Sequence, residues 1–195
     1  MLYYNIFIID KTEENNMSKE FLAFTYKIPS EPSKNRVYVW RMIKELGAVY
    51  LQQGVALLPY DKDLYLVLLN LREQVHTFKG KSTLSKLSFM QEEDEREIVD
   101  EFIKQIDGEY MEFIRNCQKS IDELEYENAQ GDFDFSEITE GEQEYKKLKQ
   151  WYDKITQRNY FKSEQQNHAA EILKKAKEKL QEYYDEVYRR DENNF

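Results

Sequence analysis

Hydrophobic residues in the first ninety positions alternate between the period of a strand and the period of a helix. The run FLAFTYKI over 21–28 is apolar and rich in β-favouring residues, and Pro29 ends it, so we predict a buried strand. A helix follows over 34–46, with Ser33 as a candidate N-cap and Gly47 where a left-handed cap favours glycine. Its apolar stripe is formed by Val39, Met42, Ile43 and Leu46.

The alternation continues with a second strand and a second helix. Residues 48–58 (AVYLQQGVALL) place apolar side chains at alternate positions, which predicts one strand with a bulge at Gly54. The helix that follows begins at Asp61 or Asp63, either of which is a good N-cap, and continues to Phe78. Both segments therefore belong to the same small domain as the first strand and helix.

A glycine and a weaker strand complete this part of the chain. Gly80 stands after the second helix in the position of a left-handed cap, and a strand follows over 81–89. An order of strand, helix, strand, helix and strand in about seventy residues is typical of a ferredoxin-like α+β sandwich. We therefore predict a ferredoxin-like α+β domain over 21–90. A variable N-terminal extension over 1–20 precedes it, and within this extension Met17 is a second candidate start.

From residue 91 onward the hydrophobic pattern becomes helical. The run QEEDE over 91–95 places negative charge at a helix N-terminus, where the helix dipole favours it. An apolar stripe then continues for about seven turns. It is formed by Ile98, Phe102, Ile106, Tyr110, Phe113, Cys117, Ile121 and Leu124. We predict one long helix, which ends before a connection over 131–136.

Two further helices are predicted after that connection. Thr139 with Glu142, and Ser163 with Gln166, have the form of capping boxes, and helical apolar spacing follows each pair. Two helices joined by a short loop usually pack as an antiparallel hairpin. We expect this hairpin to pack against the long helix, so that 91–195 is a helical subdomain packed on the first domain.

The charge of the chain is unevenly distributed. Residues 1–90 contain 12 basic and 9 acidic residues, a net charge of +3, whereas the remaining 16 basic and 29 acidic residues give 91–195 a net charge of −13. Indiscriminate binding to nucleic acid requires many cations that neutralise phosphates, so a chain with a net charge of −10 is not expected to show it. The basic first part still allows a focused contact with DNA or another anion.

Cysteine and apolar content exclude several classes of protein. Cys117 is the single cysteine of the chain, so no internal disulfide can form and no zinc-ligand spacing exists. Its place on an apolar stripe predicts a buried, inert thiol, which argues against redox or nucleophilic thiol chemistry. No segment approaches the ~20 apolar residues of a membrane span. We expect a cytoplasmic protein with no membrane partner, no metal and no cofactor.

The candidate binding site is the basic helix over 34–46. Four basic residues and one aromatic residue form it: Lys34, Arg36, Trp40, Arg41 and Lys44. Arginine forks suit phosphate and other oxyanions, and the N-terminus of the helix adds partial positive charge. The alternative is that Trp40 fills the edge of the core and the basic residues form a solvated surface.

Four segments of the first domain share a pattern with a known family. They are 26–33 (YKIPSEPS), 36–41 (RVYVWR), 46–54 (LGAVYLQQG) and 58–59 (LP). Together they resemble the N-terminal domain of the chromate resistance protein ChrB, and a weaker likeness continues through the long helix to 158–161 (RNYF). The resemblance implies chromate-responsive control of transcription beside a chromate transporter, with promoter DNA or chromate as the partner.

The resemblance also implies distant kinship with PaaX regulators and with the ferredoxin-like nucleases of CRISPR adaptation. Those nucleases place a metal-binding aspartate near the end of the first strand, whereas 25–29 (TYKIP) has no carboxylate here. Because metal-dependent hydrolysis needs oxygen ligands, we expect no nuclease activity and no catalytic residues. We predict a non-enzymatic regulator, and we expect it to form a homodimer. The alternative is a protein–protein interaction module that forms a homodimer through exposed tyrosines or docks a partner on its acidic helices.

Overall fold

The computed structural model describes residues 19–52, 54–131 and 135–192. The chain divides into two compact units, Met1–Phe102 and Ile103–Phe195, and the division falls inside one long helix. The predicted extension over 1–20 lies almost entirely outside the described residues, as does the alternative start at Met17. The predicted boundary at 90/91, and the predicted packing of one part on the other, stay predictions.

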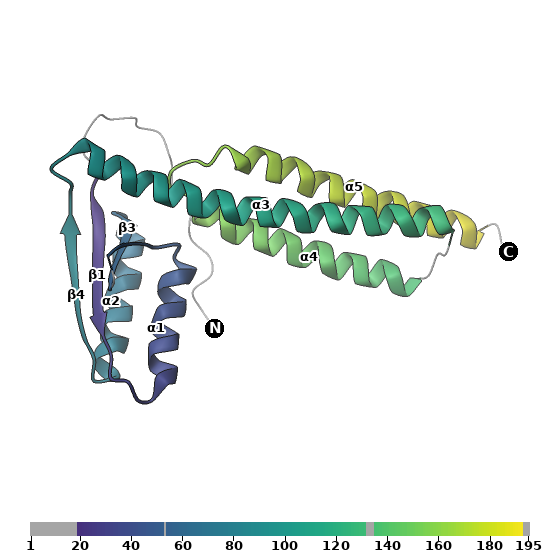
Figure 1. Ribbon diagram of the computed structural model, residues 1–195. Coiled ribbons are helices and arrows are strands. Elements are labelled where there is room, and N and C mark those ends of the chain that lie inside the picture. The colour runs from purple at the N-terminus through teal and green to yellow at the C-terminus, as the bar shows by residue number, and fades with distance from the viewer. Residues whose placement is uncertain (1–18, 53, 132–134, 193–195) are drawn as a thin grey trace. The chain divides into compact units, whose positions relative to one another are not determined.

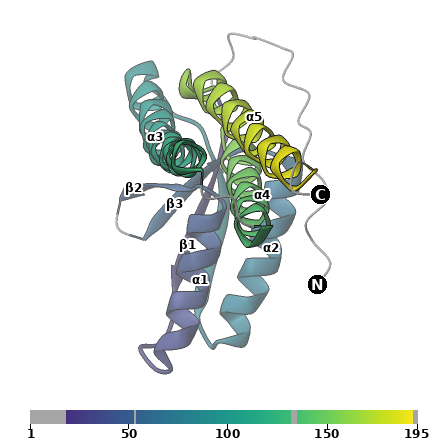
Figure 2. The same cartoon turned by 90° about the vertical axis from the view of Figure 1, so that its right-hand side faces the viewer.

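The first unit is a four-stranded sheet with two helices. Its elements are β1 (Phe21–Lys27), α1 (Ser33–Glu45), β2 (Val49–Gln52), β3 (Val55–Pro59), α2 (Lys62–Thr77) and β4 (Lys81–Leu87). The strand order is β2-β3-β1-β4, and each neighbouring pair is antiparallel. Both helices cover the same face of the sheet (Figures 1 and 2). This β-α-β-β-α-β arrangement confirms the predicted ferredoxin-like fold.

The predicted single strand over 48–58 is wrong. Gly54, with a φ of 87°, turns the chain, so that β2 and β3 form an antiparallel hairpin. Val49 pairs with Leu57 in this hairpin, and both side chains are buried. Apolar residues therefore occupy odd-numbered positions both before and after the turn. The alternating pattern in the sequence continues across the turn and does not reveal it.

The core of the first unit lies on both sides of β1. Phe21, Leu22 and Phe24 of this strand are almost completely buried. The ring of Phe21 stacks with Phe102, their centroids 6.4 Å apart, and meets Phe89 edge-on at 5.6 Å. Phe102 belongs to the first turns of α3 (Glu92–Gln130), which are part of this unit. The first half of β1 is consequently enclosed on both faces of the sheet.

The helix ends of the first unit agree with some predicted caps and correct others. Asp61 caps α2, because its Oδ1 accepts hydrogen bonds from the backbone N–H groups of Asp63 and Leu64 at 2.8 and 3.0 Å. Gly47 is left-handed after α1, with a φ of 71°, as predicted. Ser33 is not the cap of α1, since the helix begins at Ser33 itself and no side chain caps it.

Gly80 is not the left-handed residue after α2. Lys79 adopts that conformation instead, with a φ of 58°. A Cβ atom on Gly80 would lie 2.7 Å from the carbonyl oxygen of Lys27 and 2.8 Å from Cγ1 of Val75. Glycine is required here because the turn between α2 and β4 presses against the backbone of β1.

The second unit is a bundle of three helices: the remainder of α3, α4 (Phe135–Gln157) and α5 (Gln165–Glu192). Its core takes residues from all three, including Tyr110, Phe113, Ile155 and Leu173. A smaller cluster contains Leu124, Ile138, Tyr183 and Val187. α4 and α5 run antiparallel beside α3 (Figure 1), which confirms the predicted hairpin.

The predicted capping box at Thr139 is wrong, because α4 already begins at Phe135 and Thr139 lies inside it. The box at Ser163 is half formed. Oγ of Ser163 accepts a hydrogen bond from the backbone N–H of Gln165 at 3.0 Å, so it caps α5. The side chain of Gln166 does not return to Ser163, however, and instead accepts a hydrogen bond from Nδ2 of Asn159 at 2.8 Å.

Candidate functional site

The five candidate residues lie together on the exposed side of α1. Val39 and Ile43 anchor the opposite side of this helix, where both are buried. The α1 face is here defined as six exposed residues of this helix, Lys34, Arg36, Val37, Trp40, Arg41 and Lys44; Ser33, Tyr38 and Glu45 are exposed on the same helix. The predicted site is therefore a continuous surface carried by one helix.

Part of the α1 face is hollowed. Ser33, Arg36, Val37 and Trp40 line a shallow depression of about 230 Å³. Trp40 is 49% exposed, so about half of its side chain is accessible to solvent and it is not enclosed in the core. Sequence reasoning missed Val37, although its spacing from Ser33 and Trp40 is that of neighbours on a helix surface.

The α1 face is electrostatically open. All four basic side chains are exposed, and none of the ion pairs between described residues includes them. Glu45, at the C-terminal end of α1, is the one carboxylate of the helix. No side chain caps the N-terminus, where the helix dipole adds partial positive charge. The surface therefore attracts anions without first having to release an internal partner.

Comparison with protein families identifies the chain. Residues 36–194 match the family model described as the N-terminal part of protein ChrB. The chain belongs to the ChrB N-terminal family. Because ChrB is a chromate resistance protein, this membership relates the chain to chromate resistance. Comparisons with curated proteins and with solved structures found no match.

The stretch matched to the ChrB family includes a polar cluster at the turn between α4 and α5. Asn159 is 1% exposed, and its Oδ1 accepts a hydrogen bond from the backbone N–H of Ser163 at 2.8 Å. Oγ of Ser163 bonds to Oδ1 of Asp107 on α3, and the guanidinium of Arg158 pairs with Glu109. The segment 158–161 thus has a structural role, since it fastens the turn to α3.

The single thiol of this ChrB-family chain is enclosed. Cys117 is fully buried in the core of the second unit. Burial raises the pKa of its thiol to about 12, so the thiol is protonated at neutral pH. Because the thiolate is the reactive form, Cys117 is not placed for redox or nucleophilic chemistry.

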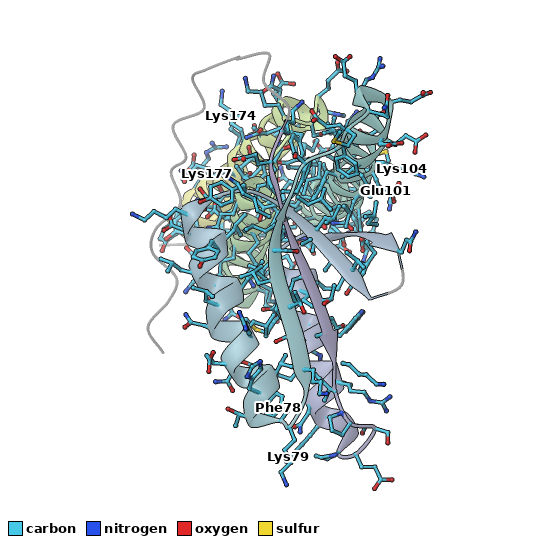
Figure 3. The ribbon with its side chains drawn as sticks, turned by 90° about the vertical axis from the view of Figure 1, so that its left-hand side faces the viewer. Phe78, Lys79, Glu101, Lys104, Lys174 and Lys177 are labelled. Carbon is cyan, nitrogen blue, oxygen red and sulfur yellow. The ribbon has the colours of Figure 1, made fainter. Side chains whose placement is uncertain are left out.

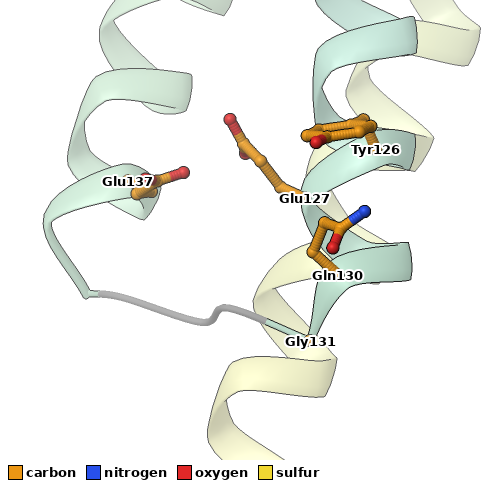
Figure 4. Close-up of a pocket in the computed structure, with 5 residues that line it drawn as sticks. All are labelled: Tyr126, Glu127, Gln130, Gly131 and Glu137. Atoms are coloured by element: carbon orange, nitrogen blue, oxygen red, sulfur yellow. The ribbon is translucent and has the colours of Figure 1, made fainter.

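A second depression, of about 570 Å³, lies between the end of α3 and the start of α4 (Figure 4). Tyr126, Glu127, Gln130, Gly131 and Glu137 line it. Burial, a hydrogen bond with Glu137 and the negative charges nearby together raise the pKa of Glu127 to about 7. No described group of histidine, cysteine or acidic residues is arranged to hold a metal ion. The pair is therefore read as two carboxyl groups that share a proton.

None of the described helices combines the length and the apolar character that a membrane span requires.

Proposed function

We propose that this ChrB-family chain is a non-enzymatic regulator in chromate resistance and that its α1 face binds promoter DNA. The observation that carries the proposal is the set of four exposed cations on one helix, none of which is engaged by a described carboxylate. An α-helix fits the major groove of DNA, and arginine can read guanine there. Lysine and arginine also contact the phosphates that position a protein on the duplex.

The distribution of charge along α1 favours a polymer over a single small oxyanion. Lys34 and Lys44 are ten residues apart, which corresponds to about 15 Å along a helix. A tetrahedral oxyanion could contact one or two of the four cations at a time. Successive phosphates along a duplex could engage all of them. The shallow hollow beside Trp40 is also too open to enclose a small anion.

Two features support the non-enzymatic part of the proposal: the state of the Cys117 thiol and the residues at the end of β1. The thiol of Cys117 is buried and protonated, so it would not reduce chromate. The end of β1, where related nucleases carry a metal-binding aspartate, has Tyr26 and Lys27 instead. Neither place offers an accessible thiol or a carboxylate that could hold a metal ion.

The experiment is a salt titration of binding to duplex DNA from the promoter of the chromate-resistance operon. The logarithm of the binding constant should fall steeply with the logarithm of salt concentration, by about 0.9 for each phosphate contact. Arg36→Gln/Arg41→Gln should lower this slope by roughly 1 to 2 and leave the fold intact. Lys119→Gln/Lys174→Gln is the matched control, because both lysines are exposed and each already has a carboxylate partner. Wild-type protein that does not bind DNA at low salt would refute the proposal.

Isothermal titration with chromate and with sulfate tests the oxyanion alternative. We expect no saturable heat from either ion if the α1 face is a DNA surface. Saturable heat that disappears in Arg36→Gln/Arg41→Gln would make the face an oxyanion site. Heat from chromate but not from sulfate would further indicate that the site distinguishes between the two dianions.

A second candidate function is a protein–protein interaction module, and exposed aromatic side chains favour it. Trp40 and Val37 offer apolar surface on α1. On α5, Tyr184 and Tyr188 stack with their centroids 4.8 Å apart, and Tyr188 is exposed. Sedimentation over a range of concentrations should show a monomer if the DNA proposal is sufficient. A dimer that Trp40→Ser disrupts would instead favour the interaction module.

A further inference from the structure

Two lysines face each other where β1 ends and β4 begins. Lys27 and Lys81 are direct partners in the antiparallel register of these strands, and both are exposed. Side chains in such a pair lie on the same face of the sheet, with Cβ atoms about 5 Å apart. Like charges in this position destabilise a sheet. The pair therefore has an unfavourable arrangement unless something negative lies beside it.

The pair lies on the face of the sheet away from α1 and α2. Along β4, Lys81, Thr83 and Ser85 are exposed, whereas the residues between them are half-buried. Thr83 is the direct partner of Thr25, so hydroxyl groups follow the lysine pair along this face. Figure 3 looks onto this side of the sheet, with both strands in front of the helices. The exposed surface is thus polar and cationic, with hydroxyl donors next to the charges.

A third lysine is fixed beside this pair. Lys79 occupies the turn between α2 and β4, where its φ of 58° is unusual for a residue with a side chain. Figure 3 shows Lys79 and Phe78 at the end of the sheet where this turn lies. The close approach of Gly80 to the carbonyl oxygen of Lys27 holds the turn against β1. The backbone of the lysine turn, defined as Lys27, Lys79 and Lys81, is therefore held in place.

The lysine turn has no ion-pair partner among the described residues, in contrast to another lysine of the same strand. Lys86 pairs with Glu20 at 2.6 Å, and its ammonium also lies 4.3 Å from the centre of the Tyr60 ring. The carboxylates nearest in the chain to the lysine turn are Glu31, before α1, and Glu73, one turn before the end of α2, and both are exposed. Neither forms an ion pair with the cluster.

We infer that the lysine turn is a second DNA contact, which binds backbone phosphates where the duplex passes the end of the unit at which α1 begins. The inference rests on the proposed function. β1 ends at Lys27 and α1 begins at Ser33, so the lysine turn and the first turn of α1, with Lys34, lie at the same end of the unit. The cluster is open and consists of ammonium groups, which bind phosphates as point charges and carry no base specificity. An exposed surface of this kind suits a polyanion rather than an enclosed small ion.

The test compares Lys27→Gln/Lys79→Asn/Lys81→Gln with wild type in the promoter DNA titration. Asparagine is chosen at position 79 because it tolerates the left-handed backbone. The salt slope should fall by about 2.7 if all three lysines contact phosphates. The triple variant should lose a similar factor in affinity for promoter DNA and for a scrambled duplex, because phosphate contacts do not read sequence. Lys86→Gln is the control on the same strand and should leave the slope unchanged.

A stability measurement accompanies the binding test. Lys27→Gln alone should raise the thermal midpoint by about 1 °C, because it relieves repulsion from Lys81. A triple variant that folds but keeps the wild-type salt slope would overturn the inference. If Arg36→Gln/Arg41→Gln still weakened DNA binding in that case, the proposed function would stand. Wild type that does not bind DNA would instead overturn the proposed function itself.

Discussion

The buried amide of Asn159 gives the most direct test of how the second unit is held together. Its Oδ1 accepts a hydrogen bond from the backbone N–H of Ser163, and its Nδ2 donates to Oε1 of Gln166, both at 2.8 Å. Asn159→Ala would leave the N–H of Ser163 without this acceptor in a site where Ser163 is 6% exposed. An unsatisfied buried donor costs about 1–3 kcal/mol, and the small cavity adds to that. We expect Asn159→Ala to lower the free energy of unfolding by about 2–4 kcal/mol.

Asn116→Ala is the matched control for this prediction. Nδ2 of Asn116 also makes a 2.8 Å hydrogen bond, to the carbonyl oxygen of Glu112, but the residue is exposed on α3. Water can replace that bond, so the free energy of unfolding should change by less than about 0.5 kcal/mol. Urea unfolding, followed by far-ultraviolet circular dichroism and by tryptophan fluorescence, measures both variants. Equal effects of the two substitutions would refute the reasoning that burial, rather than hydrogen bonding alone, sets the loss.

Two further predictions concern a shared proton and a tight turn. The pKa of Glu127 is raised from 4.5 to about 7, so its contribution to stability is complete below pH 4.5 and is lost as the pH rises through about 7. Between about pH 5 and 8, the free energy of unfolding in urea should fall by less than about 1 kcal/mol, and Glu127→Gln should abolish this fall. If the variant showed the same pH dependence, the assignment to this carboxyl group would be wrong. Gly80→Ala should lower the free energy of unfolding by about 1–3 kcal/mol, because the new Cβ meets the carbonyl oxygen of Lys27. Gly108→Ala, in open space on α3, should raise the same quantity by about 1 kcal/mol, and a loss of similar size in both variants would show that the contact at Gly80 is not responsible.

Elements with a clear period could be predicted from the sequence, whereas turns that keep the period could not. The apolar stripe around Val39 and Ile43 predicted α1, because burial of one side is what gives a helix its pattern. The hairpin of β2 and β3 was read as one strand, because its turn at Gly54 does not interrupt the alternation. A positive φ at Gly54 and a bulge are both compatible with glycine, so composition did not distinguish them.

Caps show a similar limit. Asp61 was predictable because its side chain acts on its own helix. The left-handed residue after α2 was not, because Gly80 is the expected choice and Lys79 adopts that conformation instead. The reason is tertiary: Gly80 is needed where the turn presses on the backbone of Lys27. A packing requirement that involves another strand therefore determines which residue is left-handed, and the local preference for glycine does not.

The candidate site divides in the same way. The cations of the α1 face are close in sequence, so helical spacing alone placed them on one surface. The lysine turn joins Lys27 to Lys79 and Lys81, which are far from it in sequence. Their proximity depends on the register of β1 and β4, and sequence periodicity carries no information about which strands pair. That part of the cationic surface could be recognised only from the structure.

The opposing effects expected on stability and binding distinguish a functional lysine from a structural one. A residue such as Asn159 should lose stability when it is replaced, because its partners are internal. Lys27 faces a like charge and no described carboxylate pairs with it, so its replacement should slightly stabilise the fold and still weaken DNA binding. A packing role for the Lys27 stem would instead make its replacement destabilising. The sign of the stability change, measured on the same variant as the salt slope, therefore decides whether the lysine pair is retained for the fold or for a negatively charged partner.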